Sequence, residues 1–338
     1  MSDPSGPGID ASCWIVSDGN PGAENQCLGL AEALDLDPQV IRVSHPPVLR
    51  LLPPHLLSAG LWLRLAQTGP SSRKEVLAFR PPWPDILISC SRKAVGFSIA
   101  VRRLSGKKTF TAHIQAPQVP VRCFDLVAPP AHDGLKGENV VETIGALNRI
   151  TARQLAEAAK IWGPGLAHLP RPLVAVLIGG ATRRHRLDPQ DAEHIADQIF
   201  ALAERENAGV IVTPSRRTPP AVAEVLQRRF CTPRAHCWDG TGPNPYFGFL
   251  ALADMIAVSG DSVSMISEAC TTGKPVYMIE LSGGSGRFHR FYERLRRDDR
   301  IRPLGERLET WYYPPLDDTE RVAQAVRDRI LASPVVSK

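Results

Sequence analysis

Residues 254–281, DMIAVSGDSVSMISEACTTGKPVYMIEL, predict a strand, a Ser/Gly loop, a helix and a second strand in immediate succession. Residues 254–259 are apolar and rich in β-branched side chains, Gly260 interrupts them, and Asp261 or Ser262 can cap the helix that follows. Such a βαβ unit aims backbone N–H groups and a helix N-terminus at one point. The segment therefore favours either an anion site or a plain crossover of a doubly wound sheet.

The length and composition of the chain limit the class of protein and the kind of ligand that we expect. With 338 residues it is longer than one ordinary domain, and 43% apolar with 22% charged residues is normal for a folded protein. The formal charge of +5 comes mostly from arginine, in short clusters beside predicted loops. This pattern favours phosphate-bearing small molecules as ligands and not nucleic acid.

Cysteine and histidine usage excludes several kinds of site. The seven cysteines have no C-x-x-C spacing, and the nine histidines show neither H-x-x-x-H nor H-E-x-x-H spacing. We therefore expect no disulfide framework, no metal site and no cofactor. The N-terminus is polar, and no apolar run approaches the roughly twenty residues of a membrane span. We expect a cytoplasmic chain that is free or peripheral at the inner face of a membrane.

Strand and helix signals alternate through the first half of the chain, which predicts a parallel sheet with helices on both faces. Strands are predicted over 13–18, 39–44, 85–90, 107–114, 124–130 and 138–145, and helices over 23–34 and 92–104. Thr151 can cap a further helix over 151–162, and the Gly/Pro-rich residues 163–172 have the composition of a linker.

The second half begins a new series of the same kind. Strands are predicted over 172–180, 209–215 and 234–240, and helices over 188–207, 218–230, 244–253 and 319–331, in addition to residues 254–281. We expect an α/β fold with two doubly wound Rossmann-like domains. Their predicted bounds are 1–12 for a disordered N-terminus, 13–165 and 166–316 for the two domains, and 317–338 for a C-terminal helix and tail.

Four Gly-, Ser- and Arg-rich loops follow strands of the second half, and the carboxyl ends of parallel strands meet at one edge of a sheet. Glycine lets the backbone approach a ligand, serine donates hydrogen bonds, and arginine binds phosphate oxygens, so the loops resemble a diphosphate pocket. Glu268 can accept hydrogen bonds from a ribose or can be an ordinary exposed helical glutamate. The candidate binding residues are Gly179, Gly180, Arg183, Ser215, Arg216, Ser259, Gly260, Asp261, Ser262, Ser264 and Glu268.

The first half offers the loop 17–26, SDGNPGAENQ, between a strand and a helix. Asp18 or Glu24 could deprotonate an acceptor hydroxyl while the backbone at Gly19 and Gly22 holds an oxyanion. A glutamate near a helix start is also explained by the helix dipole alone. His113, near the end of a predicted strand, is a third candidate base, although a histidine at a strand end is more often a structural hydrogen-bonding group.

Residues 48–66, VLRLLPPHLLSAGLWLRLA, are unusually apolar. Two prolines make the segment too broken to span a bilayer, but a short amphipathic helix within it could lie at a membrane surface or hold a lipid-linked acceptor. A helix packed into the first domain's core is the alternative.

Two family resemblances follow from these motifs. SGDSVSMISEACTTGKPVYMIE is similar to the donor-site helix of GT-B glycosyltransferases such as the lipid II-forming N-acetylglucosaminyltransferase, in which a glutamate on that helix meets the nucleoside. More extensively, SDGNPGAENQCLGLAEAL, ILISCSRKA, GGATRRHRL, TPSRRTP, NPYFGFLALAD and SGDSVSMISEACTTGKPVY resemble the mitochondrial-fission "elongated mitochondria" family over roughly residues 12–330.

The resemblance implies a GT-B-like fold, in which two Rossmann-like domains face a cleft. The first hypothesis is a metal-independent glycosyltransferase-like protein that binds a nucleotide-diphosphate sugar in the interdomain cleft and transfers the sugar to a lipid-linked or envelope acceptor. The second is a non-catalytic adaptor peripheral to a membrane, because the plant members of the family recruit a dynamin-related GTPase to the mitochondrial surface.

Overall fold

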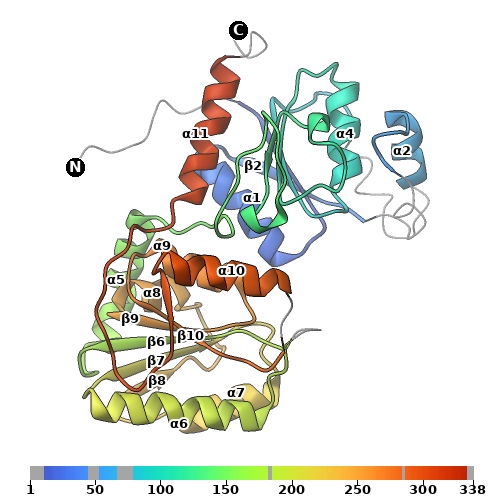
Figure 1. The fold of residues 1–338 in the computed structure, drawn as a ribbon. Helices are drawn as coiled ribbons and strands as arrows, with labels where there is room; N and C mark the ends of the chain where they lie inside the picture. Colours follow the sequence, from blue (N-terminus) through green and yellow to red (C-terminus); the bar gives the residue numbers. More distant parts are fainter. Residues whose placement is uncertain (1–10, 45–52, 67–78, 182–184, 284–285, 333–338) are drawn as a thin grey trace. The chain divides into compact units, whose positions relative to one another are not determined.

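The computed structural model describes residues 11–44, 53–66, 79–181, 185–283 and 286–332. These residues form two compact units: residues 1–149 with 317–338 belong to the first, and residues 150–316 to the second. Each unit is built on its own parallel sheet, as the alternating strand and helix signals predict (Figure 1). The predicted disordered segment 1–12 lies almost entirely outside the described residues.

The first unit contains a five-stranded parallel sheet with strand order β2-β1-β3-β4-β5. Its strands are β1 (Cys13–Ser17), β2 (Pro38–Arg42), β3 (Ile86–Cys90), β4 (Phe110–Ile114) and β5 (Leu126–Ala128). Its helices are α1 (Pro21–Ala33), α2 (Ala59–Ala66), α4 (Val95–Leu104) and α11 (Asp318–Leu331). Strands β1, β3, β4 and β5 are buried throughout, so their sequences are mostly apolar and do not alternate with exposed polar residues.

Helix α11 completes the core of the first unit although it comes last in the sequence. Val322, Val326 and Ile330 are buried in one cluster with residues of α1, β1 and β3. The buried Asp318 fixes the start of the helix by accepting hydrogen bonds from the backbone N–H groups of Ile144 at 3.1 Å and Gly145 at 2.8 Å. The C-terminal helix is therefore part of the first unit.

The second unit contains a six-stranded parallel sheet with strand order β11-β10-β9-β6-β7-β8. Its strands are β6 (Leu173–Ile178), β7 (Gly209–Pro214), β8 (Ala235–Cys237), β9 (Met255–Ser259), β10 (Val276–Ile279) and β11 (Ile301–Pro303). Its helices are α5 (Ala152–Leu166), α6 (Pro189–Arg205), α7 (Pro220–Phe230), α8 (Tyr246–Leu252), α9 (Val263–Thr271) and α10 (Gly286–Arg297). Figure 1 shows α6 and α7 along one face of this sheet and α8, α9 and α10 over the other.

The structure also departs from the sequence-based predictions in other places. Residues 138–145 make isolated bridges through Val140 and Thr143 but no strand. Helix α5 was placed with the first domain, whose end was predicted at residue 165, whereas it packs on α8 in the second unit. Helix α10, GRFHRFYERLRR, was not predicted, because its arginines obscure a buried stripe of Phe291, Tyr292 and Leu295.

Candidate functional site

The strand order of the second unit sets the position of the candidate site. Strands β6 and β9 are neighbours, and the chain proceeds from them toward opposite edges of the sheet. In a doubly wound sheet such a switch point separates two successive loops and leaves a crevice at the carboxyl ends of the strands. The loops at residues 179–181 and 260–262 flank this point.

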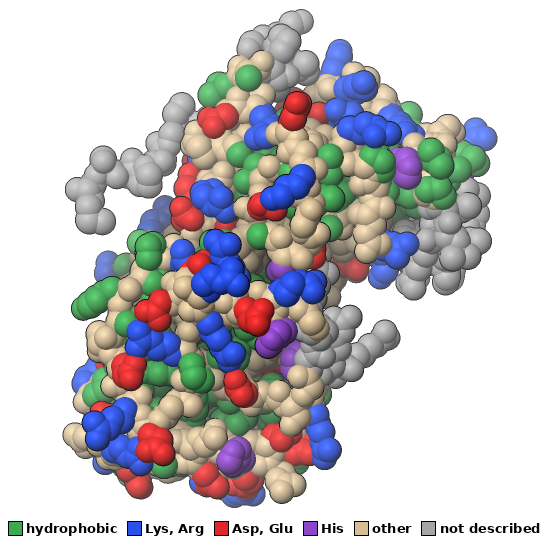
Figure 2. All heavy atoms as spheres, in the orientation of Figure 1, with side chains coloured by type: hydrophobic (Ala, Val, Ile, Leu, Met, Phe, Trp, Pro, Cys, Tyr) green, Lys and Arg blue, Asp and Glu red, His purple; other side chains and the backbone are tan. Residues whose placement is uncertain are grey.

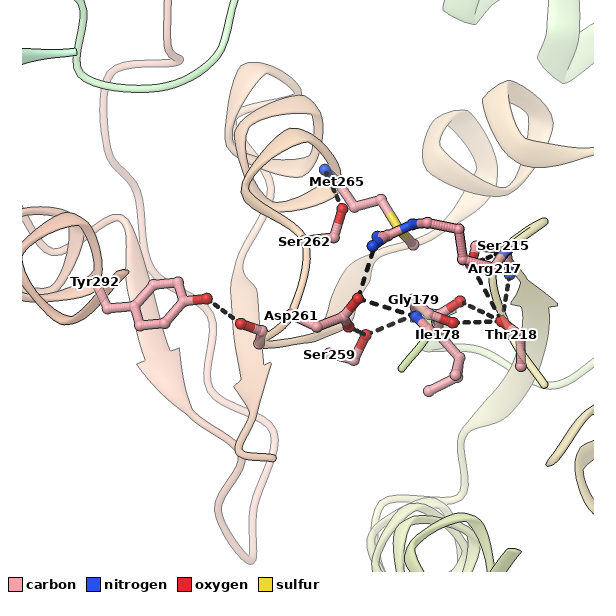
Figure 3. Close-up of polar contacts among 12 residues, drawn as sticks. Ile178, Gly179, Ser215, Arg217, Thr218, Ser259, Asp261, Ser262, Met265 and Tyr292 are labelled. Atoms are coloured by element: carbon pink, nitrogen blue, oxygen red, sulfur yellow. Dashed lines mark hydrogen bonds and ion pairs between the residues drawn. The ribbon is translucent and has the colours of Figure 1, made fainter. Parts of the chain in front are cut away.

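The buried carboxylate of Asp261 joins the loops that follow β6, β7 and β9 (Figure 3). It accepts hydrogen bonds from the Gly180 N–H at 2.9 Å, the Ser259 hydroxyl at 2.7 Å and the Arg217 guanidinium at 3.2 Å. Ser259 in turn accepts a bond from the Gly179 N–H at 2.7 Å. The predicted binding residues Gly179, Gly180, Ser259 and Asp261 are thus brought together, and their hydrogen bonds hold the loops in place.

The two glycines are required here by close approach. A Cβ on Gly179 would overlap the carboxylate of Asp261, and a Cβ on Gly180 would overlap the backbone of Arg217. Any side chain at these positions would push the β6 loop away from its partners.

The loop after β7 is fastened to the end of β6. The Ser215 N–H donates to the Ile178 carbonyl at 2.8 Å, and the Thr218 hydroxyl donates to the same carbonyl at 3.2 Å. The two adjacent arginines of the β7 loop lie in different surroundings. Arg217 reaches Asp261 with a half-exposed side chain, whereas Arg216 is exposed and makes no hydrogen bond or ion pair with the described residues. Sequence reasoning selected Arg216 and missed Arg217, since a pair of arginines in a loop gives no signal of which one turns inward.

The N-terminus of α9 lies at the same edge of the sheet. The Ser262 hydroxyl caps the helix by accepting a bond from the Met265 N–H at 3.4 Å. Ser264 is in the first helical turn, is half-buried and makes no hydrogen bond with its side chain among the described residues. The Tyr292 hydroxyl of α10 donates to the Gly260 carbonyl. First-turn N–H groups and a free hydroxyl at a helix N-terminus are suited to bind an anion.

Glu268 lies further along α9 and is half-buried rather than exposed. The Tyr246 hydroxyl, at the start of α8, donates to Oε2 of Glu268 at 2.5 Å, and no described residue bonds Oε1. Burial raises the pKa of Glu268 to about 7, and the hydrogen bond from Tyr246 partly opposes this shift. The carboxyl group is thus held in one orientation with one oxygen available to a ligand.

Arg183 lies outside the described residues, so its predicted contribution stays a prediction.

In the first unit the two candidate carboxylates are both paired with cations. Arg42 binds Glu24 through two nitrogens, at 3.0 and 2.7 Å, and Ser17 donates to it at 3.1 Å. The bond from Arg42 holds the pKa of Glu24 below its ordinary value, which disfavours a role as general base. Asp18 lies 3.6 Å from the Lys93 ammonium, a looser contact.

The glycines of the same loop do not offer the free N–H groups that the sequence analysis expected. The Asn20 side chain caps α1 and accepts the Gly22 N–H at 3.0 Å. The Gly19 N–H donates to the Ser17 hydroxyl at 3.2 Å, and Gly19 adopts a positive φ of 76° that starts the turn. Both glycines therefore shape the loop, and neither N–H is available to an oxyanion in this conformation.

His113 is not placed as a general base requires. It lies within β4 with 1% of its surface exposed, its Nδ1 is 2.9 Å from the Ser89 hydroxyl, and its ring packs against Phe124. Burial lowers its pKa to about 3, so the imidazole stays neutral and out of reach of a substrate. The alternative role, that of a structural hydrogen-bonding histidine, fits this position, because β4 is buried along its whole length.

The described part of the chain offers neither a metal-binding cluster nor a membrane-spanning helix. No group of three or more His, Cys, Asp or Glu side chains there is arranged to hold a metal ion. Within the same ranges no helix has the length and apolar character needed to cross a bilayer.

Comparison with known proteins places the chain in a family. The sequence profile described as "Mitochondrial fission ELM1" matches residues 21–330. The chain belongs to the mitochondrial fission ELM1 family. It is 29% identical to "Mitochondrial fission protein ELM1" of Arabidopsis thaliana, over 94% of this chain and 91% of the relative. It is 24% identical to an uncharacterized protein of Rickettsia prowazekii, over 93% of this chain and 97% of the relative.

Solved structures similar to this ELM1-family chain identify its fold. The UDP-GlcNAc 2-epimerase of Methanocaldococcus jannaschii has a TM-score of 0.53 at 12% identity, covering 94% of this chain and 99% of that enzyme. The Neisseria meningitidis UDP-GlcNAc 2-epimerase, solved bound to UDP-GlcNAc, has a TM-score of 0.51 at 13% identity, covering 96% and 94%. This similarity shows a GT-B-like α/β fold with two Rossmann-like units, in agreement with the prediction from the sequence.

Proposed function

We propose that this ELM1-family protein binds a nucleotide-diphosphate sugar at the carboxyl-terminal edge of its second sheet. The observation that carries the proposal is the convergence of three strand-end loops on the N-terminus of α9, joined through Asp261. The structurally similar epimerases of M. jannaschii and N. meningitidis were solved with UDP-GlcNAc, the former also with UDP, which supports this ligand class.

The diphosphate would be bound by the first-turn N–H groups of α9, by Ser264 and by the arginines of the β7 loop. Arg217 and Arg216 supply positive charge that the helix N-terminus reinforces, so we expect binding to need no divalent cation. Asp261 is assigned a different role from the one that the sequence suggested. Its carboxylate is buried and already accepts hydrogen bonds from three donors, so it positions Arg217 and does not contact phosphate.

Glu268 would accept a ribose hydroxyl through Oε1 while Tyr246 holds Oε2. A carboxylate that is oriented in advance loses little conformational freedom when it binds such a hydroxyl.

Isothermal titration calorimetry against UDP, ADP, GDP and CDP tests the proposal. We expect at least one diphosphate to bind with a millimolar or lower Kd, in EDTA as well as without it. Arg217→Ala should weaken that binding about 10- to 100-fold, because a charge-assisted hydrogen bond is lost. The matched control is Arg307→Ala, which removes an exposed arginine elsewhere in the second unit. Failure of all four diphosphates to bind, or equal losses in both variants, would overturn the proposal.

Glycosyl transfer would in addition need a base to deprotonate the acceptor hydroxyl. Since His113 is buried and Glu24 is paired with Arg42 through two nitrogens, we assign this step to Asp18.

A non-catalytic adaptor is the alternative function, and the similarity to the Arabidopsis fission protein favours it. The two functions differ in turnover. The protein is incubated with a donor sugar that it binds, with and without isolated membranes as acceptor. A transferase should release nucleoside diphosphate only when the membranes are present, because the sugar then has an acceptor. Binding without release identifies the adaptor.

A further inference from the structure

The first unit carries apolar side chains that no part of its described structure covers. Leu56 is 73% exposed, Leu61 in α2 is 45% exposed, and Leu104 at the end of α4 is 44% exposed. Exposed leucines are individually ordinary, but Leu61 and Leu104 lie on two helices that pack against each other, and Leu56 lies in the turn just before α2.

Helices α2 and α4 hold these leucines in a fixed arrangement. The buried Trp62 of α2 meets Phe97 of α4 edge to face, with ring centroids 6.4 Å apart. Gly96 permits this approach, since a Cβ there would overlap the Trp62 ring. Arg103 of α4 donates to the backbone carbonyls of His55 and Leu57, which ties the segment before α2 to α4.

The charged side chains on the segments that carry these leucines are basic, and Asp125, the carboxylate beside α4, is paired with Arg102 at 2.6 Å. Residues 53–66 and 86–124 contain no Asp or Glu. Lys107 and Lys108, in the turn that follows Leu104, are exposed and form no ion pair with the described residues, and Arg64 of α2 is exposed as well. Figure 2 shows hydrophobic side chains gathered over α2 and Lys and Arg side chains over the neighbouring α4.

We propose that the α2–α4 surface, formed by Leu56, Leu61, Leu104, Lys107 and Lys108, docks on an anionic lipid bilayer. Leucines can enter the boundary between headgroups and acyl chains while the lysines meet lipid phosphates and carboxylates. A purely apolar partner would leave the lysines unmatched, whereas an anionic membrane surface complements both components. The proposal goes beyond nucleotide binding, which concerns only the second unit.

Co-sedimentation of the full chain with vesicles tests this assignment. We expect binding to phosphatidylcholine vesicles that contain phosphatidylserine, little binding to pure phosphatidylcholine, and weaker binding at 0.5 M than at 0.1 M salt, because salt screens exposed charges. Leu61→Glu should lower the partition coefficient about tenfold or more, and Lys107→Gln about fivefold. Both positions are exposed, so the melting temperature should change little.

The matched control is Leu331→Glu, which changes an exposed leucine on α11 of the same unit. It should bind vesicles as the wild type does. The assignment is overturned if the wild type stays in the supernatant with both vesicle types, or if Leu331→Glu is as damaging as Leu61→Glu. A dimer found without lipid and abolished by Leu61→Glu would instead assign the surface to a second copy of the chain. Nucleotide titration of Leu61→Glu keeps the two proposals separable, since its affinity should match the wild type.

Discussion

At the scale of single residues, the site contains two acids, the buried Asp261 and the half-buried Glu268, whose hydrogen-bond partners determine what each can do. Asp261 and Glu268 both come from the segment around α9, yet one is bonded by three donors and the other keeps a free oxygen. A buried polar group costs stability unless its hydrogen bonds are made, so each acid depends on its neighbours. Asp261 therefore holds the strand-end loops in place, and Glu268 remains available to bind a ligand.

Asp261→Asn is expected to lower the free energy of unfolding by about 1 to 3 kcal/mol. The amide keeps the shape of the side chain but loses the charge that pairs with Arg217, and its NH₂ group cannot accept a bond from Gly180 or Ser259. Urea denaturation monitored by tryptophan fluorescence measures the change. Asp197→Asn, at an exposed ion pair on α6, should stay within about 0.5 kcal/mol of the wild type. Equal effects of the two substitutions would contradict the assigned role.

The raised pKa of Glu268 predicts a pH dependence of stability. The folded-state pKa of about 7 lies above the ordinary value of 4.5, so between these values the folded protein binds more protons than the unfolded chain. The contribution of this group is therefore present below about pH 4.5 and is lost as the pH rises toward 7 and above.

Glu268→Gln should remove this dependence. Relative to the wild type, the variant should gain up to about 3 kcal/mol of unfolding free energy between pH 4.5 and pH 8. Urea denaturation at pH 4.5, 6 and 8 measures the difference, and Glu224→Gln, at an exposed position on α7, is the control. If the unfolding free energies of the wild type and Glu268→Gln change with pH in the same way, the carboxyl group does not titrate in this range.

At the scale of elements, the decisive feature is the contact between the β6 loop and the β9 loop. The N–H groups of Gly179 and Gly180 reach Ser259 and Asp261 only because neither glycine carries a side chain. The conformation of the loops at this edge of the sheet thus depends on close approach of the backbone as much as on the side chains that form the hydrogen bonds.

Gly179→Ala should destabilise the second unit by about 1 to 3 kcal/mol and abolish nucleotide binding, because its Cβ would overlap Asp261. Gly165→Ala is the matched control. Gly165 lies in α5, where a Cβ would meet no atom within 4 Å, so alanine should be neutral or stabilise by about 0.5 to 1 kcal/mol. Thermal unfolding and calorimetry on both variants check the pair. A Gly179→Ala protein with wild-type stability would mean that the loop has room to relax.

At the scale of the whole molecule, the two units share an α/β architecture but differ in which segments of the chain complete them. The second is continuous in sequence, residues 150–316, whereas the first needs residues 317–338 from the other end of the chain. The apolar face of α11 covers the core of the first unit through Val322, Val326 and Ile330.

Deleting residues 317–338 should therefore destabilise one unit selectively. We expect loss of amide protection in β1, β3, β4 and β5, because Val322, Val326 and Ile330 leave their buried positions, while β6, β7 and β9 stay protected. Hydrogen exchange with mass spectrometry measures both sets of strands in one sample. Equal loss of amide protection in both sets of strands, or no loss in either set, would contradict the expectation that the two units fold independently.

Local sequence patterns determined the class of the fold. Continuous apolar runs of five to six residues, as in β6 and β7, and Gly, Pro and Ser at the ends of helices gave the alternating elements and the parallel sheets. Family motifs added the GT-B-like fold. Local patterns failed where polar residues conceal a buried face, as in α10, or where a short segment such as 138–145 has strand-forming residues but makes only isolated bridges.

The candidate site was predictable only as a set of loops. The sequence alone places Gly179, Ser259, Asp261 and Glu268 at strand ends or on the following helix, because the alternation of elements fixes which loops share an edge. Only the tertiary structure decided that Arg217 turns inward, that Glu24 is paired with Arg42 and that His113 is buried. The physical reason is that burial, ion pairing and pKa depend on neighbours distant in sequence, which no local pattern of residues specifies.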